Sequence, residues 1–182
     1  MGPQAHHTRI ALFGGSFNPP HLGHRQVVEY LCGLEAFDEI WIVPAFDHPF
    51  EKNLAPYEDR VKMCGLFVQG TKAKVSRIEE DLAQKPSYMI DTLRALKKKN
   101  PGVKFSIVVG SDIKPELEQW KDIGALKKEA EFFFIPRAGI ENSPFLDISS
   151  TEIRKLIREG KTVAYLIPTG VMEYIKHRKL YA

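Results

Sequence analysis

The sequence has few cysteines and no long apolar runs. Its 182 residues include two cysteines, Cys32 and Cys64. Each lies in an apolar helical pattern without metal-ligand spacing, so we expect free thiols in a reducing compartment and no disulfide. The longest apolar runs, such as Phe132 to Ile135, have the length of a strand, and the polar segment from Met1 to Arg9 is no secretory signal. We therefore expect a cytoplasmic protein that does not enter a membrane.

The chain also lacks a strong charge of one sign. Its formal net charge is +3, and the run Lys97 to Lys99 lies where a helix end favours cations. Basic residues interleaved with aromatics, as nucleic-acid grooves require, are absent, so no nucleic-acid partner is expected. The length and the 43% hydrophobic content suit one well-filled core, so residues 1–182 are expected to form a single domain.

Short apolar segments alternate with helical patterns along the chain. Strands are predicted at residues 10–13, 39–43, 74–76, 105–109 and 131–135. The intervening helices carry the stripes Val27/Val28/Leu31, Tyr57/Val61/Cys64/Val68 and Met89/Leu93/Leu96, and residues 149–159 and 168–177 form a helical C-terminal portion. This alternation predicts an α/β fold with a doubly wound, Rossmann-like parallel sheet. Ligands are then expected beyond the carboxyl ends of the strands.

A glycine turn follows the first expected strand. Residues 14–24 read GGSFNPPHLGH. The glycines permit a tight turn and close approach of a ligand, and the prolines bar helix before His21, so a helix is expected to begin at His21 or just after it. Such a start leaves unpaired backbone N–H groups where the helix dipole favours negative charge, which predicts a phosphate site.

His21 and His24 are expected on one face of that helix, one turn apart. They could also form a structural surface pair or two ligands of a metal site. A metal site needs further ligands, and the motif contains no Cys, Asp or Glu. We therefore favour phosphate contacts for both rings.

A second polar motif begins the helix expected from residue 149. Ser149 followed by Glu152 is a capping box, which can be purely structural. If Ser149 caps the helix, the hydroxyls of Ser150 and Thr151 are free at its N-terminus. Arg154 then lies four residues from Ser150 on the same face. The arrangement indicates an anion site.

Four segments together resemble one family. The run GGSFNPPHLGH resembles the signature of the nucleotidyltransferase α/β-phosphodiesterase superfamily and, within it, of bacterial nicotinate-nucleotide adenylyltransferases. Residues 148–154, ISSTEIR, resemble its ISSTxIR signature, residues 86–93, PSYMIDTL, its PSYTxDTL segment, and residues 110–112, GSD, its GxD turn. The likeness follows family order over nearly the whole chain.

The resemblance implies adenylyl transfer from ATP to nicotinate mononucleotide, giving nicotinate adenine dinucleotide and pyrophosphate. The acceptor phosphate is already an anion, so the site needs positioning and charge stabilisation instead of a general base. The implied catalytic residues are His21, His24 and Arg154. Mg²⁺ is expected on the ATP phosphates, without a protein ligand set of its own. The implied ATP site comprises Gly14, Gly15, Ser16, Phe17, Lys52, Gly110, Asp112, Ser150 and Thr151.

The implied acceptor site comprises Asn18, Tyr88, Thr92 and Trp120, with Asp112 beside the pyridine ring. Trp120 is the favoured stacking partner, although it could be a partly buried structural aromatic. The sequence departs from the family pattern at Asn18 for Asp, at Met89 for Thr, and at residues 48–52, HPFEK, for a PPHK-like run. These departures lie mostly on the acceptor side.

Other functions stay open at this point. Nicotinamide mononucleotide or another phosphomonoester could be the acceptor in the same chemistry, and a non-catalytic nucleotide-binding regulator is a different class. Phosphopantetheine adenylyltransferases share the first motif, but the other motifs favour the pyridine branch. The sequence also leaves a homo-oligomer open.

Overall fold

The computed structural model describes residues 7–50, 53–136 and 143–182. Within these residues one parallel sheet contains all the predicted strands. Short, β-branched and apolar segments form them, as expected for strands covered on both faces. Their bounds are β1 Arg9–Gly15, β2 Glu39–Pro44, β3 Ala73–Val75, β4 Lys104–Gly110 and β5 Glu131–Ile135.

The order of the strands, β3-β2-β1-β4-β5, reverses beside β1. The chain adds β2 and β3 on one side of β1 and then returns to place β4 on the other. Phe13 of β1 pairs with Val108 of β4, so the two strands end together. Their carboxyl ends form the topological switch point, where open α/β sheets bind ligands.

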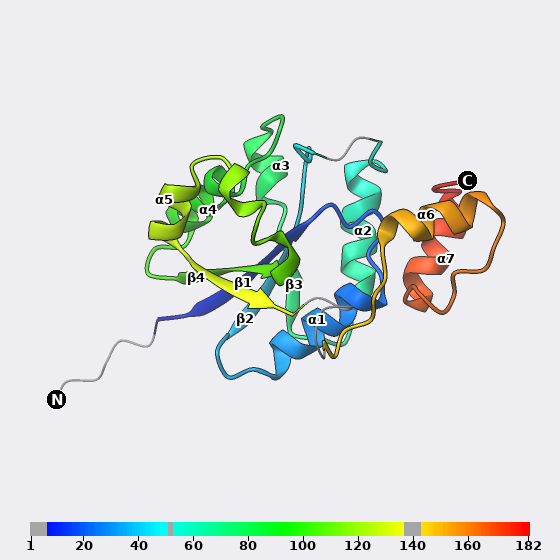
Figure 1. The fold of residues 1–182 in the computed structure, drawn as a ribbon, viewed down its shortest axis with the longest axis horizontal. Coiled ribbons are helices and arrows are strands. Elements are labelled where there is room, and N and C mark those ends of the chain that lie inside the picture. Colours follow the sequence, from blue (N-terminus) through cyan, green and yellow to red (C-terminus); the bar gives the residue numbers. More distant parts are fainter. Residues whose placement is uncertain (1–6, 51–52, 137–142) are drawn as a thin grey trace.

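Helices cover both faces of the sheet (Figure 1). One face packs against α1 and α2, with α6 and α7 joining the same apolar cluster, and the other packs against α3, α4 and α5. The bounds are α1 Leu22–Gly33, α2 Tyr57–Phe67, α3 Ile78–Leu82, α4 Met89–Lys99, α5 Ile123–Glu129, α6 Ser150–Arg158 and α7 Thr169–Arg178, with short 3-10 turns η1 Ser111–Ile113 and η2 Leu117–Gln119. The doubly wound prediction and the helical C-terminal portion are confirmed.

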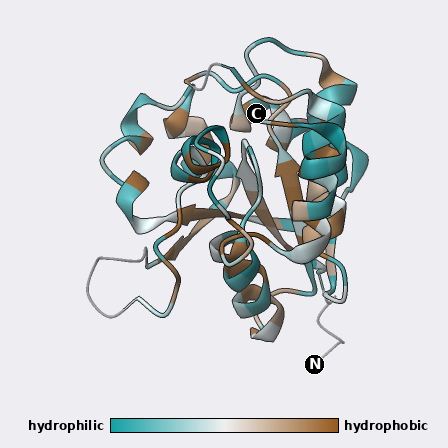
Figure 2. Cartoon of the chain, turned by 90° about the vertical axis from the view of Figure 1, so that its right-hand side faces the viewer, coloured by the Kyte–Doolittle hydropathy of each residue, from teal (hydrophilic) through white to brown (hydrophobic). Residues whose placement is uncertain are grey.

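Alternation along the strands divides the core into two layers. Ala11 and Val108 face one layer, whereas Leu12 and Ile107 face the other. Figure 2 shows the apolar strands at the centre, between helices with hydrophilic outer surfaces. Close packing on both faces holds the central strands in place, and this fixes the positions of the loops that follow them.

The apolar stripe predicted for α2 is confirmed in part. Cys64 and Val68 are buried as predicted, but Tyr57 and Val61 are only half-buried, and Met63, Phe67 and the charged Arg60 are buried as well. Packing of α7 against α2 covers a side that sequence periodicity leaves undecided.

Both cysteines are unpaired, with Cys64 buried and Cys32 half-buried. Among the described residues, no helix is both long and apolar enough to span a bilayer.

Candidate active site

The last residues of β1 lie close to α4. A Cβ added to Gly14 would lie 2.9 Å from Cε of Met89, so glycine allows this close approach. Phe17 adopts φ 48°, in the left-handed region. Its side chain is buried and stacks on Phe67 with ring centroids 5.8 Å apart. Phe17 therefore supports the turn from the core.

The helix α1 begins with a reciprocal histidine cap. The backbone N–H of His21 donates to Nδ1 of His24 at 3.2 Å, and the N–H of His24 donates to Nδ1 of His21 at 3.4 Å. The ring centroids are 3.7 Å apart. The predicted helix start is confirmed, with an imidazole pair in the role usually played by Ser and Glu.

This cap determines the chemistry of the rings. A neutral imidazole that accepts at Nδ1 carries its proton at Nε2. Burial, together with the neighbouring His21, holds the pKa of His24 well below its usual value of 6.5. His24 is therefore neutral at pH 7 and has an Nε2–H donor. Both rings line a polar cavity.

The start of α6 faces the same cavity. The Ser149 hydroxyl accepts a hydrogen bond from the Thr151 N–H at 3.2 Å, so Ser149 is the predicted cap. The bond goes to the second helical amide instead of that of Glu152, so the predicted capping box with Glu152 is wrong in detail.

The prediction that the hydroxyls of Ser150 and Thr151 are free is also wrong. The Ser150 hydroxyl donates to the carbonyl of Pro19 at 2.9 Å, which ties α6 to the turn. The Thr151 hydroxyl accepts from Nη2 of Arg154 at 3.2 Å, and Nη1 of Arg154 donates to the carbonyl of Asn18 at 2.7 Å. These bonds orient the guanidinium toward the cavity, which Arg154 lines.

The GxD turn follows β4. Asp112, in η1, folds back so closely that a Cβ at Gly110 would collide with its carboxylate. Any side chain at Gly110 would therefore displace the Asp112 carboxylate from its position. Both residues line the polar cavity.

The polar cavity has a volume of ≈ 490 Å³ and is partly open to solvent. It joins the start of α1, the GxD turn and the start of α6, which are far apart in the sequence. Its lining includes the predicted residues Ser16, His21, His24, Gly110, Asp112, Ser150, Thr151 and Arg154. Imidazoles and a guanidinium around one space suit a polyphosphate. The prediction of unpaired amides at the start of α1 is wrong for two of them, because the N–H of Leu22 donates to the carbonyl of Leu166 at 2.9 Å and that of His24 donates to His21.

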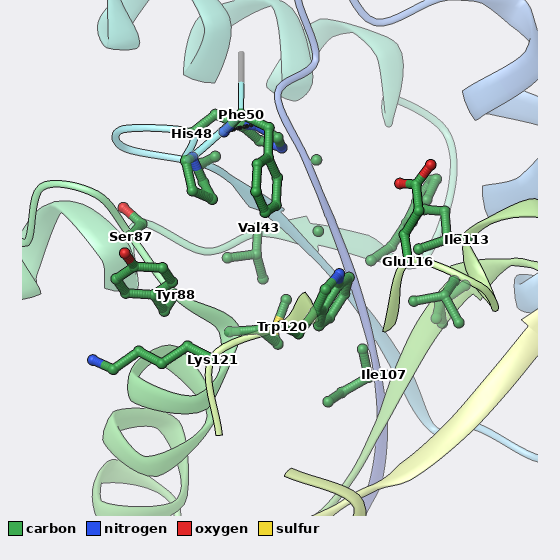
Figure 3. Close-up of a pocket in the computed structure, with 18 of the residues that line it drawn as sticks. Val43, His48, Phe50, Ser87, Tyr88, Ile107, Ile113, Glu116, Trp120 and Lys121 are labelled. Atoms are coloured by element: carbon green, nitrogen blue, oxygen red, sulfur yellow. Dashed lines mark hydrogen bonds between the residues drawn. The ribbon is translucent and has the colours of Figure 1, made fainter. Parts of the chain in front are cut away.

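A second, mainly apolar cavity of ≈ 280 Å³ adjoins it and shares the walls Phe13, Val108 and Gly110. Figure 3 shows Trp120 in this cavity, with His48 and Phe50 across from it. The size and the aromatic lining suit a planar ring.

A lysine lies at one end of this apolar cavity. Figure 3 shows Tyr88 and Lys121 there, and Nζ of Lys121 lies 4.7 Å from the centroid of the Tyr88 ring. The same ammonium group forms an ion pair with Asp91 at 2.9 Å. Gly14 and Gly15 line the cavity on the β1 side.

Two predicted acceptor residues lie behind the cavity walls. The Thr92 side chain is fully buried, and its hydroxyl donates to Oε1 of Glu79 at 2.9 Å. Asn18 is also fully buried, and its Oδ1 accepts from the N–H of Ala55 at 3.0 Å. Both side chains support the site from behind, and a direct contact with the acceptor stays a prediction. Lys52 lies outside the described residues.

Sequence reasoning missed two buried charged residues. Arg60 is 1% exposed and donates to the carbonyls of Ser16 at 2.8 Å and Ala55 at 3.0 Å. Glu79 lines the apolar cavity and accepts from the N–H of Phe46 at 2.9 Å. Burial raises the pKa of the Glu79 carboxyl, and its hydrogen bonds partly oppose that rise. A basic residue between the apolar positions of α2 could have indicated that Arg60 is buried. Glu79 lies in an acidic run, which is typical of an exposed surface and gives no indication of burial.

The described residues include no cluster of three or more His, Cys, Asp or Glu side chains that could hold a metal ion.

The fold and the two cavities define a nucleotide-binding α/β protein. A family model described as cytidylyltransferase-like matches residues 12–156. "Probable nicotinate-nucleotide adenylyltransferase" of Myxococcus xanthus is 36% identical over 96% of this chain and 95% of its own length. The protein of the same name from Anaeromyxobacter dehalogenans is 38% identical over 94% and 96%. The chain belongs to the cytidylyltransferase-like family and, within it, to the nicotinate-nucleotide adenylyltransferases.

Solved structures agree on the fold. The nicotinic acid mononucleotide adenylyltransferase of Plasmodium falciparum, complexed with NaAD, superposes with a TM-score of 0.83 at 23% identity over 96% of this chain and 98% of that one. The same protein complexed with APC gives a TM-score of 0.74 at 21% identity over 96% and 98%.

Proposed function

We propose that this chain transfers the adenylyl group of ATP to nicotinate mononucleotide, forming nicotinate adenine dinucleotide and pyrophosphate. One observation carries the proposal. A polar cavity and an apolar cavity share a wall at the carboxyl ends of β1 and β4, so a polyphosphate and a planar ring would meet there. The names of the curated relatives point to the same reaction.

The polar cavity would hold ATP. A phosphate oxygen of the acceptor forms a bond to the α-phosphorus, the bond from that phosphorus to the β-bridging oxygen breaks, and pyrophosphate leaves. The Nε2–H donors of His21 and His24 suit the charge that develops at the α-phosphate. Arg154 and the first amides of α6 suit the departing phosphates.

The apolar cavity would hold the pyridine ring. Trp120 offers a face for stacking, and the ammonium group of Lys121 offers a positive charge near one end. That ammonium already pairs with Asp91, and the carboxylates of Glu79 and Glu116 also line the cavity, so the preference for nicotinate over nicotinamide rests on the names of the curated relatives.

Mg²⁺ fits this donor set as a metal bound through the ATP phosphates, with the Asp112 carboxylate in the cavity wall. When bound, the ion neutralises phosphate charge and stabilises pyrophosphate as the leaving group.

The remaining expectations are part of the same proposal. The 182 residues would work as one nucleotidyltransferase domain in the cytoplasm, where two unpaired cysteines are normal. Self-association into a homo-oligomer stays open.

The test is pyrophosphate release from ATP and Mg²⁺ with four acceptors: nicotinate mononucleotide, nicotinamide mononucleotide, phosphopantetheine and none. We expect the fastest release with nicotinate mononucleotide and weaker release with the nicotinamide form. Equal or reversed preference overturns the nicotinate assignment and leaves adenylyl transfer standing. ATP binding without release on any acceptor would instead identify a nucleotide-binding regulator.

A further inference from the structure

The segment after α7 reaches back to the turn that begins the active site. The Tyr181 hydroxyl donates to Oδ1 of Asn18 at 2.9 Å, across 163 positions in the sequence. The N–H of Ala55 donates to the same oxygen at 3.0 Å. Nδ2 of Asn18 is buried and has no hydrogen-bond acceptor among the described residues. The Asn18 side chain is therefore held through its oxygen, and Tyr181 supplies one of the two donors.

Asn18 is also the residue that orients Arg154. Its carbonyl accepts from Nη1 of Arg154 at 2.7 Å, and the next carbonyl, that of Pro19, accepts from the Ser150 hydroxyl at 2.9 Å. Thus Tyr181 holds the side chain of Asn18 while the main chain of the same residue holds the guanidinium. A shift of Asn18 would move Arg154 within the polar cavity.

Backbone conformation and packing both fix the path of the chain after α7. Lys179 and Tyr181 both adopt the left-handed region, at φ 52° and φ 67°, which is uncommon for residues other than glycine. Leu180 and Tyr181 pack against the buried cluster between the sheet and α2. Surrounding contacts therefore fix the position of the Tyr181 ring.

The neighbouring anchor of α7 is separate from the active site. The Tyr174 hydroxyl and Nε of Arg178 donate to Oδ1 of Asp59 on α2, at 2.7 Å and 3.0 Å.

Burial raises the pKa of the Tyr181 phenol, so this hydroxyl keeps its proton and stays a donor at physiological pH. The Tyr174 hydroxyl thus bonds a carboxylate of α2, whereas the Tyr181 hydroxyl bonds a neutral amide of the active-site turn.

We propose that Tyr181 is a positioning residue for nucleotide binding and transfer, which acts by holding Asn18 and thereby fixing the guanidinium of Arg154. The proposal rests on the proposed function for its kinetic effect, but its effect on ATP binding does not depend on any acceptor.

The experiment compares Tyr181→Phe with the matched control Tyr174→Phe, because each substitution removes one hydroxyl. Tyr174→Phe should lose at least as much thermal stability as Tyr181→Phe, because its hydroxyl bonds a buried carboxylate and not a neutral amide. Tyr181→Phe should weaken ATP binding in calorimetry and lower kcat/KM for ATP by about fivefold, the effect of one lost hydrogen bond. Tyr174→Phe should keep both quantities within about twofold of wild type. Equal effects of the two variants would make Tyr181 merely structural and overturn the proposal.

A double-mutant cycle tests the route through Arg154. In an Arg154→Ala background, Tyr181→Phe should cause no further loss of ATP affinity, because the group that Tyr181 positions is gone. Additive losses would overturn the proposed route. If wild type binds ATP but releases no pyrophosphate, the proposed function fails, and the calorimetry still decides the role of Tyr181.

Discussion

Thr92→Val should weaken the fold more than it weakens acceptor binding. The family resemblance implies that Thr92 contacts the acceptor, but the structure buries its side chain and bonds its hydroxyl to Glu79 at 2.9 Å. Valine keeps the shape and removes the hydroxyl, which leaves a buried carboxylate with one donor fewer.

The magnitude follows from the type of bond. A hydrogen bond to a buried charged group contributes about 1.5–3 kcal/mol, and Glu79 retains the N–H of Phe46 as a donor. We expect a loss of about 2 kcal/mol in the free energy of unfolding. For a chain of this size, that corresponds to a fall in Tm of about 4–8 °C.

The effect should also depend on pH. Burial raises the folded-state pKa of Glu79 above its usual 4.5, so the folded state holds this proton more tightly and stability falls as pH rises from 4.5 to the folded pKa. The Thr92 hydroxyl opposes that rise in pKa. Removing it should therefore cost more stability at a pH above the folded pKa, where it bonds a charged carboxylate, than at pH 4, where Glu79 is protonated.

The assay is chemical and thermal unfolding at both pH values, with acceptor KM measured well below Tm. Thr92→Ser keeps the hydroxyl and serves as the control. In a Glu79→Gln background, Thr92→Val should cost the same stability at both pH values. A large rise in acceptor KM with unchanged Tm would refute this reasoning and place the hydroxyl on the acceptor.

Two further predictions concern the cavities. Trp120→Ala should raise the KM for the mononucleotide by about 5- to 150-fold, which corresponds to the 1–3 kcal/mol of one stacked ring, and should affect the KM for ATP far less. Trp41→Ala, which removes the other tryptophan outside the cavity, is the control, and equal effects on both substrates would make Trp120 structural. His24→Ala should lower kcat by roughly 10²–10³ with a smaller change in ATP affinity. Because the folded pKa of His24 lies below 6.5, kcat should be flat from pH 6.5 to 8 and fall at lower pH, and near-normal turnover of His24→Ala would make the histidine pair structural.

Local sequence was sufficient to predict the strands and helices and one turn of the site. Strand alternation, the glycines at 14 and 15 and the prolines before His21 act through neighbouring residues, so the sheet class and the start of α1 could be predicted. The pairing of Ser149 with the first amides of α6 is local for the same reason.

Only the tertiary structure decided how these segments meet. The reversal of strand order beside β1 places residues 14–24, 110–112 and 149–154 around one cavity, which no local pattern specifies. It also decided that Thr92 bonds Glu79, that Arg60 lies buried under the turn, and that Tyr181 reaches Asn18. Each of these contacts joins residues distant in sequence, and burial forces their polar groups to find partners that only the packed chain supplies.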